Sequence, residues 1–153
     1  MNELSVVQNN IPAMSNMAIG KVRKLESFAL CMPQIDIDTS HVIHAGMYAR
    51  TIMIPAGVMI TGALIKIATM LIVQGDVIAY IGDDTIELHG HTVLPASANR
   101  KQAFIAQTDT YLTMIFLSDA KSVEEAEEQF TDEADMLISR KDTVGNQVII
   151  TGE

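Results

Sequence analysis

The chain has 153 residues, of which 48% are hydrophobic and 19% charged, so it is long and apolar enough to fold around one core without disulfides or metal ions. The formal net charge of −9 argues against nucleic-acid binding, because no cluster of Lys and Arg is available to neutralise phosphates. The apolar run 63–73 contains Lys66 and is too short to span a bilayer, so no membrane partner is expected. The single cysteine, Cys31, cannot form an intramolecular disulfide and is typical of a reducing compartment.

Residues 1–20 are polar and aperiodic, with Pro12 and Gly20 as helix and strand breakers, and we expect them to form an extended arm. Such an arm gains order only from a neighbouring surface, and we expect that surface to belong to another chain. Deletion of the arm is then expected to leave the rest of the chain folded. The predicted partner-anchoring residues are Ile11, Met14, Met17 and Ile19.

Residues 21–40 are predicted to form a short helix and a linker. Val22, Leu25 and Phe28 recur at helical spacing, and Pro33 ends the helix.

Residues 41–118 have the pattern of an all-β domain. Short β-rich runs alternate with turn signals, and no connection is long enough for a helical crossover between parallel strands. This pattern predicts a sandwich or barrel of seven or eight strands. The expected strands are 48–54, 64–73, 77–81, 85–88, 91–94, 103–107 and 111–117.

Residues 119–153 are predicted to form an acidic helix and a C-terminal tail. Residues 121–153 carry nine acidic and three basic side chains, and Ser122 to Glu125 have the spacing of a capping box. An apolar stripe from Val123 to Leu137 predicts one helix packed on the barrel, although Thr131 to Glu133 could instead start a second helix. Residues 148–150 are expected to add a last short strand.

The segments IPAGVMITGALIKIATMLIVQGD and HTVLPASANRKQAF, with the tail VEEAEEQFTDEADMLISR, resemble a family of cupin-domain proteins encoded by tailed bacteriophages. The resemblance covers roughly residues 30–141. It implies a cupin-like double-stranded β-helix, which is a jelly-roll barrel, with an N-terminal arm and short helix and a C-terminal acidic α-helix.

The metal-ligand positions of the cupin motifs are not retained in this chain. The resemblance places Ala63 and Ile65 at the usual His pair, Ala68 or Thr69 at the carboxylate, and Arg100 at the last His. Alanine and isoleucine cannot coordinate a metal, and arginine brings a fixed positive charge. We therefore expect no metal, no other cofactor and no catalytic residue.

Arg100 and Lys101 form the only adjacent basic pair in the β region. The pair could hold a phosphate or carboxylate of a small ligand at the barrel mouth, because arginine presents a bidentate fork. The alternative is an ion pair with an acidic neighbour, in the same chain or across a subunit interface. His89 and His91 are interpreted as a solvated pair in a turn rather than as metal ligands.

Two functions are carried forward from the sequence. The first is a non-enzymatic, homo-oligomeric phage cupin, a structural or assembly component of the virion such as a capsid cement or head–tail accessory protein, with other phage structural proteins as partners. The alternative is a metal-free small-molecule-binding cupin inside the infected cell. The protein is accordingly expected in the virion, in the host cytoplasm, or in both.

Overall fold

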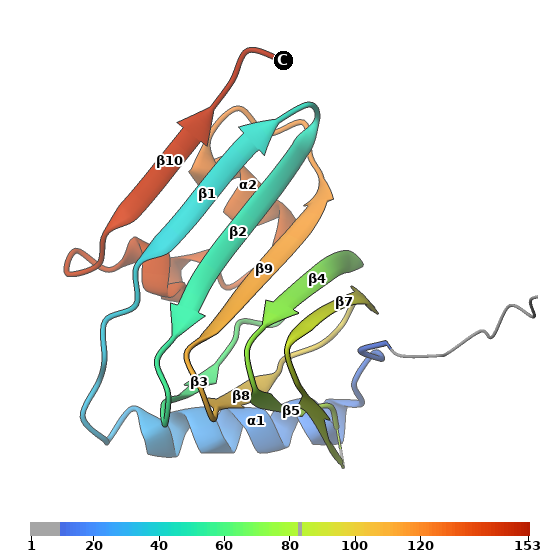
Figure 1. The fold of residues 1–153 in the computed structure, drawn as a ribbon, viewed down its shortest axis with the longest axis vertical. Coiled ribbons are helices and arrows are strands. Elements are labelled where there is room, and N and C mark those ends of the chain that lie inside the picture. The colour runs from blue at the N-terminus through green and yellow to red at the C-terminus, as the bar shows by residue number, and fades with distance from the viewer. Residues whose placement is uncertain (1–9, 83) are drawn as a thin grey trace, which may run out of the picture.

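The computed structural model describes residues 10–82 and 84–153, which form two facing β-sheets flanked by helices (Figure 1). The helices are α1 (Asn16–Ala29) and α2 (Val123–Phe130), followed by two 3-10 turns, Ala134–Met136 and Ile138–Arg140. The strands are β1 (Thr39–His44), β2 (Met47–Ile54), β3 (Met59–Thr61), β4 (Thr69–Gln74), β5 (Val77–Tyr80), β6 (Thr85–Leu88), β7 (His91–Ala96), β8 (Ala103–Ala106), β9 (Thr110–Leu117) and β10 (Asn146–Ile150). None of the helices among the described residues is long and apolar enough to cross a membrane.

The strand order is that of a jelly roll. The larger sheet has the order β10-β1-β2-β9-β4-β7, and the smaller one β3-β8-β5-β6. Strand β2 pairs with β9, and β3 pairs with β8. On the other side of these partners, β4 pairs with β9 in the larger sheet and β5 pairs with β8 in the smaller one. This is the order of a double-stranded β-helix, and it confirms the jelly-roll part of the predicted fold.

The core lies between the two sheets because alternate side chains of each strand point inward. In β4, Thr69, Leu71 and Val73 are buried, whereas Met70 and Gln74 are exposed. The buried cluster also includes Ile11, Ile54, Val77, Ala79, Leu88, Leu94, Ala96, Phe104, Ala106 and Leu112. The turn from β4 to β5 requires Gly75, whose φ is +136° and where a Cβ atom would lie 2.5 Å from the Thr110 hydroxyl.

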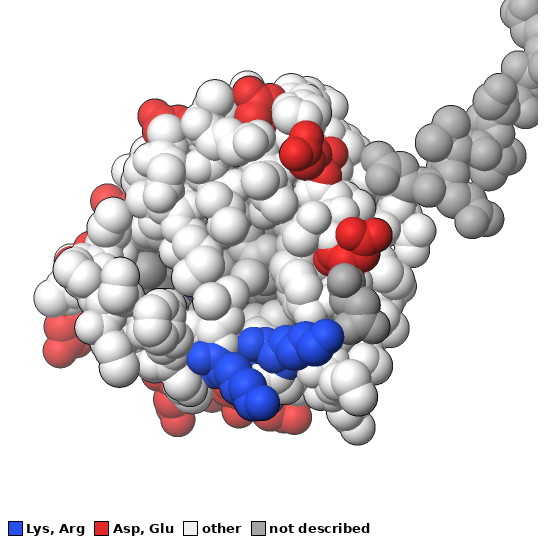
Figure 2. Space-filling view, turned by 90° about the horizontal axis from the view of Figure 1, so that it is seen from below, with Lys and Arg blue, Asp and Glu red and all other residues white. Residues whose placement is uncertain are grey.

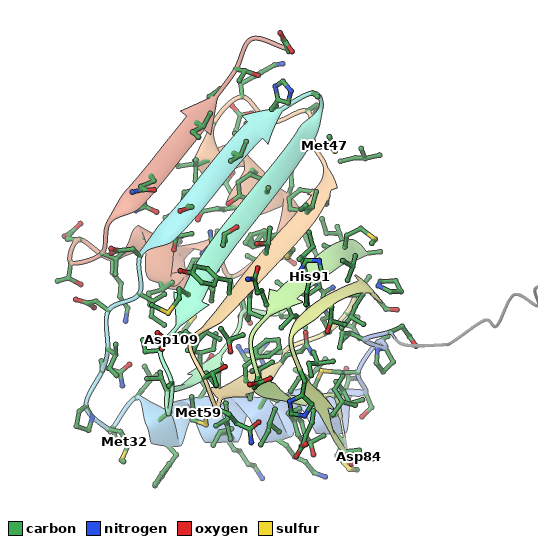
Figure 3. The ribbon with its side chains drawn as sticks, in the orientation of Figure 1. Met32, Met47, Met59, Asp84, His91 and Asp109 are labelled. Carbon is green, nitrogen blue, oxygen red and sulfur yellow. The ribbon has the colours of Figure 1, made fainter. Side chains whose placement is uncertain are left out.

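Among residues 10–82 and 84–153, no helix covers the outward face of the larger sheet (Figure 1). Figure 1 shows this sheet face-on, with α2 on its far side. Figure 3 shows the side chains in the same view, with Met47 at one end of β2 and His91 at the start of β7. The opposite, inward face packs at one end against α2 through the aromatic rings of Tyr48, Phe116 and Phe130.

The prediction of an extended arm over 1–20 is wrong from residue 16 onward. Helix α1 begins at Asn16, because the Ser15 side chain accepts a hydrogen bond from the Ala18 N–H and caps it. Its inward residues Ala18, Ile19 and Val22 pack on the barrel. Residues 1–9 lie outside the described part of the chain.

The predicted partner-anchoring residues also need correction. Ile11 is fully buried in the barrel core, and Met14 and Ile19 are almost fully buried in the same chain. The Ile11 N–H donates to the Pro95 carbonyl at 2.9 Å, which adds this residue to the edge of β7. Of the four predicted anchoring residues, only Met17 is exposed enough to contact a partner, with 72% of its surface accessible.

The expected strand 64–73 and C-terminal helix are shorter than predicted. Residues 64–68 cross between the sheets, and the Lys66 N–H donates to the Phe130 carbonyl instead of to a strand. Helix α2 stops at Phe130, and 3-10 turns replace the rest of the predicted helix. The predicted last strand is present as β10, which pairs in parallel with β1 and so belongs to the larger sheet rather than to a separate tail.

Helix α1 gives one side of the molecule its basic residues. Its outward face carries Lys21, Arg23 and Lys24, all exposed. Figure 2, which looks at the molecule from the α1 side, shows basic side chains in one group, with acidic ones around the margin of a largely uncharged area.

Candidate functional site

A cavity of about 720 Å³ extends from the space between the two sheets of the jelly roll to the surface beside the end of α1. Strands of both sheets supply its walls, because their inward positions converge on the same space. The apolar wall residues include Ile52, Ile60, Ile65, Leu71, Phe104, Leu112 and Met114. A volume of this size is within the range of about 300 to 1,000 Å³ found for small-molecule sites.

Large apolar side chains also line the cavity where it reaches the surface. They come from the end of α1, the linker that follows it, and the first 3-10 turn. Each is more than half exposed: Phe28, Leu30, Met32, Ile35 and Met136. The cavity is therefore bordered by apolar surface that a ligand with an apolar body would cover.

Arg100 brings a positive charge into this apolar space. The residue is only 2% exposed and lines the cavity. Its Nη1 donates to the Ser97 carbonyl at 2.7 Å, and its Nη2 donates to the Thr69 hydroxyl at 2.7 Å. Within the described chain, no carboxylate lies at ion-pair distance from its guanidinium.

Burial lowers the pKa of Arg100 to about 10, because desolvation disfavours the charged form. This value is still well above neutral pH, so the side chain is a cation under ordinary conditions. A buried cation without an anionic partner is unfavourable, and a bound anion would relieve it.

The cupin motif positions come together around this charge, as the resemblance implied. Ile65 and Arg100 form a β-bridge, with the Ile65 N–H donating to the Arg100 carbonyl at 2.8 Å. Ala63, like Ile65, lines the cavity, and Thr69 contacts the guanidinium directly. Side chains of this kind do not fit a metal ion. The described residues contain no group of three or more His, Cys, Asp or Glu that could hold one.

Lys101 lines the cavity as Arg100 does, but unlike Arg100 it is paired with carboxylates. Its Nζ lies 2.9 Å from a Glu26 carboxylate oxygen, 2.8 Å from the Gly62 carbonyl and 3.6 Å from Glu133. Burial by itself raises the pKa of Glu133, but hydrogen bonding to Arg23 and the charge of Lys101 outweigh it and hold the pKa below its usual value. The ion-pair alternative is therefore the one realised at Lys101, within one chain.

Arg50, a third cation of the cavity wall, is also paired. Its Nη1 lies 2.8 Å from a Glu127 oxygen, and its guanidinium stacks over the Phe130 ring at 5.5 Å. The other Glu127 oxygen accepts from Arg140 at 2.7 Å, and Ser139 also bonds to this carboxylate. Burial would raise the pKa of Glu127, but these partners together lower it below its usual value.

Gln102 supplies an unsatisfied donor at the cavity wall. The residue is 6% exposed, and its side-chain nitrogen has no hydrogen-bond partner among the described residues. A buried donor left unpaired costs about 1 to 3 kcal/mol, and a ligand oxygen would recover that cost. Sequence reasoning missed Gln102, because nothing in the local pattern reveals that its amide is buried without a partner.

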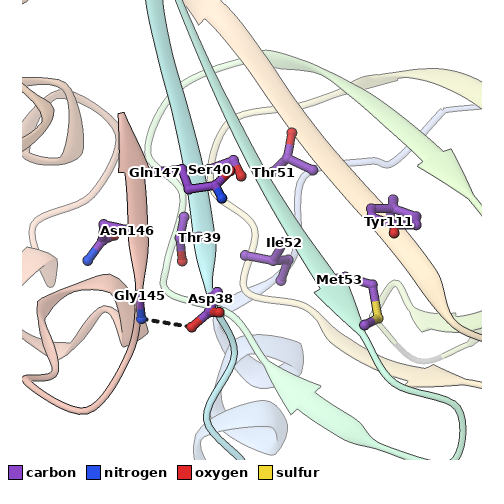
Figure 4. Close-up of a pocket in the computed structure, with 10 residues that line it drawn as sticks. All are labelled: Asp38, Thr39, Ser40, Thr51, Ile52, Met53, Tyr111, Gly145, Asn146 and Gln147. Carbon is purple, nitrogen blue, oxygen red and sulfur yellow. Dashed lines mark hydrogen bonds between the residues drawn. The ribbon is translucent and has the colours of Figure 1, made fainter. Parts of the chain in front are cut away.

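A second, smaller hollow of about 300 Å³ lies at the ends of β1, β2 and β10 (Figure 4). The Asp38 carboxylate at its edge already accepts from the Gly145 N–H at 2.7 Å. None of the four histidines lines either of the two hollows. His89 is exposed beside Asp76 and Glu87, whose hydrogen bonds raise its pKa. The interior cavity is therefore the candidate site.

Comparisons with known proteins identify neither a family nor a function for this chain. No protein-family model and no curated protein matches the sequence. Similar solved structures include a protein of Photorhabdus luminescens, at 15% identity and a TM-score of 0.48 over 56% of this chain and 78% of that one.

Two further examples are described as cupins. A cupin superfamily protein of Desulfitobacterium hafniense is 15% identical, with a TM-score of 0.45 over 74% of this chain and all of that one. The cupin domain of Cnp3 from Schizosaccharomyces pombe is 16% identical, with a TM-score of 0.44 over 59% of this chain and 72% of that one. Because these TM-scores are below 0.5, the fold assignment rests on the strand order of β2 to β9. Phage origin stays a prediction.

Proposed function

We propose that this protein is a metal-free cupin that binds a small organic anion, a carboxylic acid with an apolar body, in the cavity of its jelly roll. The observation that carries the proposal is the buried Arg100, which lines an apolar cavity and has no carboxylate partner in the described chain, its Nη atoms bonding only to neutral groups. The proposal takes up the small-molecule alternative raised by the sequence.

The polar and apolar parts of the cavity suit the two ends of such a ligand. Arg100 provides the charge, and the side-chain nitrogen of Gln102 provides a free donor for a carboxylate oxygen. The walls and the apolar border of the opening would cover the ligand's body, since burial of each CH₂ group contributes about 0.8 kcal/mol. Charge-assisted hydrogen bonds to the carboxylate would fix its orientation.

The chemistry of the donor set is the reason for proposing binding without metal-dependent catalysis. By the resemblance, Ala63, Ile65 and either Ala68 or Thr69 stand where a metal-dependent cupin would hold its ion, and such side chains do not form a metal site. A carboxylate at Arg100 is held rather than converted.

Binding is placed ahead of the virion role because the predicted arm contacts are made within the chain. Ile11, Met14 and Ile19 are buried against the chain's own barrel, which leaves the virion hypothesis without its main structural support.

The test is calorimetric titration of the full chain with octanoate and with octanol, its uncharged counterpart. We expect octanoate to bind at least tenfold more tightly than octanol. Arg100→Gln should weaken octanoate binding about 10- to 100-fold, since a hydrogen bond to a charged group contributes about 1.5 to 3 kcal/mol. Lys66→Gln, which removes an exposed charge paired with Asp132, is the matched control and should bind normally.

A second variant keeps Arg100 intact and guards against misfolding. Ala63→Phe should fill part of the cavity, leave the melting temperature near that of the wild type, and abolish binding. Equal affinity for octanoate and octanol, or unchanged binding in folded Arg100→Gln and Ala63→Phe variants, would contradict the proposal.

A further inference from the structure

The outward face of the six-stranded sheet contains no charged residue. The register of the paired strands identifies its members, which alternate with the buried inward residues. None of them is Asp, Glu, Lys or Arg. They are Gln147 and Ile149 of β10; Ser40, Val42 and His44 of β1; Met47, Ala49, Thr51 and Met53 of β2; Tyr111, Thr113, Ile115 and Leu117 of β9; Met70, Ile72 and Gln74 of β4; and His91, Val93 and Pro95 of β7.

Much of this uncharged face is apolar and open to solvent. Met47, Met70, Val93, Tyr111 and Leu117 are between 41% and 84% exposed. They come from four strands, so the apolar surface extends across the sheet and is not confined to one edge (Figure 3). Monomeric proteins rarely leave so extended an apolar surface uncovered.

We propose that the uncharged face is the contact surface for a second copy of this chain, and that the two larger sheets pack face to face in a two-fold dimer. Such a dimer is independent of the ligand proposed above. In an isologous contact each residue meets the same set of residues from the other copy.

The charge distribution favours a second copy as the occupant. The chain has a formal net charge of −9, so two copies repel each other over most of their surfaces. The uncharged face is where they can approach without bringing like charges together or burying an unpaired one. Two polar residues of the face, Thr51 and Thr113, bond to each other through their hydroxyls at 2.8 Å. They therefore need no hydrogen-bond partner from the second copy.

The size of the face also suits a small, specific dimer. Six strands about 4.8 Å apart and about 20 to 25 Å long cover roughly 500 to 600 Å² in projection. Stable interfaces bury about 800 Å² of accessible surface on each partner, and a corrugated face exposes more than its projection. Protein interfaces usually have an apolar core and a polar rim. Here methionine and tyrosine lie in the face, and charged residues lie outside it, such as Asp109 in the turn before β9 (Figure 3).

The test compares charge insertions on and off this face by light scattering coupled to gel filtration. The wild-type chain is expected to elute at twice its 16.7 kDa mass at micromolar concentration. Met70→Glu should raise the dimer dissociation constant by about 100-fold or more, because two like charges would be buried across the interface. Phe28→Glu, at an exposed apolar residue of α1, is the matched control and should remain dimeric.

Val93→Glu provides a second test on the same face, with circular dichroism to verify that each variant is folded. Both face variants should be folded monomers. The proposal would be overturned by a wild-type monomer at these concentrations, by a Met70→Glu or Val93→Glu protein as dimeric as the wild type, or by equal dissociation of Phe28→Glu. Dimerisation through another surface, or capture of a different partner by the uncharged face, would appear as one of these results.

Discussion

Truncation of Ile11 to alanine tests whether the N-terminal segment belongs to the core. Ile11 is fully buried among the side chains between the two sheets. Its N–H donates to the Pro95 carbonyl, and its carbonyl accepts from the Ser97 N–H. The substitution removes buried methyl and methylene groups and leaves a cavity that close-packed strands cannot fill. Substitutions of this kind cost about 2 to 5 kcal/mol, a large part of the roughly 5 to 15 kcal/mol that stabilises a typical domain.

The assay is urea unfolding followed by circular dichroism, with Met17→Ala as the matched control. Met17 comes from the same segment, but its side chain is 72% exposed, so its truncation should change the free energy of unfolding by less than about 0.5 kcal/mol. If Ile11→Ala were as stable as Met17→Ala, the segment would be an arm after all, and the core described above would be wrong.

Two further predictions concern buried ionisable groups. Glu127→Gln should lower the free energy of unfolding by about 3 to 5 kcal/mol at pH 7, because it leaves the Arg50 guanidinium without its carboxylate. Since the folded pKa of Glu127 is depressed, this difference should shrink as the pH falls through that pKa, and a constant difference down to pH 3 would contradict it. Burial lowers the pKa of His41, so the unfolded state binds the proton more readily and stability should fall below pH 6.5 by up to about 1.4 kcal/mol per pH unit. His41→Gln should lose this part of the pH dependence in unfolding titrations between pH 7.5 and 5.5, whereas His91→Gln should keep it.

Most strands were predictable because their signals are local. Residues 85–88 and 111–117 are short β-rich runs between turn residues, and the structure places β6 and β9 there. The run 64–73 misled because an apolar sequence does not distinguish a strand from a segment that crosses between sheets. The crossing depends on hydrogen bonds from Leu64 and Lys66 to Glu133 and Phe130, nearly 70 residues away in sequence.

Gly20, interpreted as a breaker, places the predicted helix after residue 20, whereas the Ser15 side chain caps α1 at Asn16. Glycine costs a helix about 1 kcal/mol relative to alanine, and burial of Ala18, Ile19 and Val22 on the barrel offsets that cost. Tertiary contacts of this kind cannot be inferred from helix propensity.

Part of the candidate site was predictable and part was not. The resemblance to the cupin motifs groups Arg100 with Ala63, Ile65 and either Ala68 or Thr69, and in the structure Arg100 contacts Thr69 and pairs with Ile65. The ion pairs of Lys101 and the free donor of Gln102 depend on distant segments, so no local pattern could distinguish them.

A crystal structure of the protein with 8-bromooctanoate tests the central claim most directly, because the bromine locates one end of the ligand and the carboxylate the other. The account predicts the carboxylate within hydrogen-bonding distance of the Arg100 guanidinium and the Gln102 side-chain nitrogen, with the bromine signal among the apolar residues toward the cavity opening. A reversed ligand, a ligand bound only outside the jelly roll, or an empty cavity at saturating concentration would contradict it.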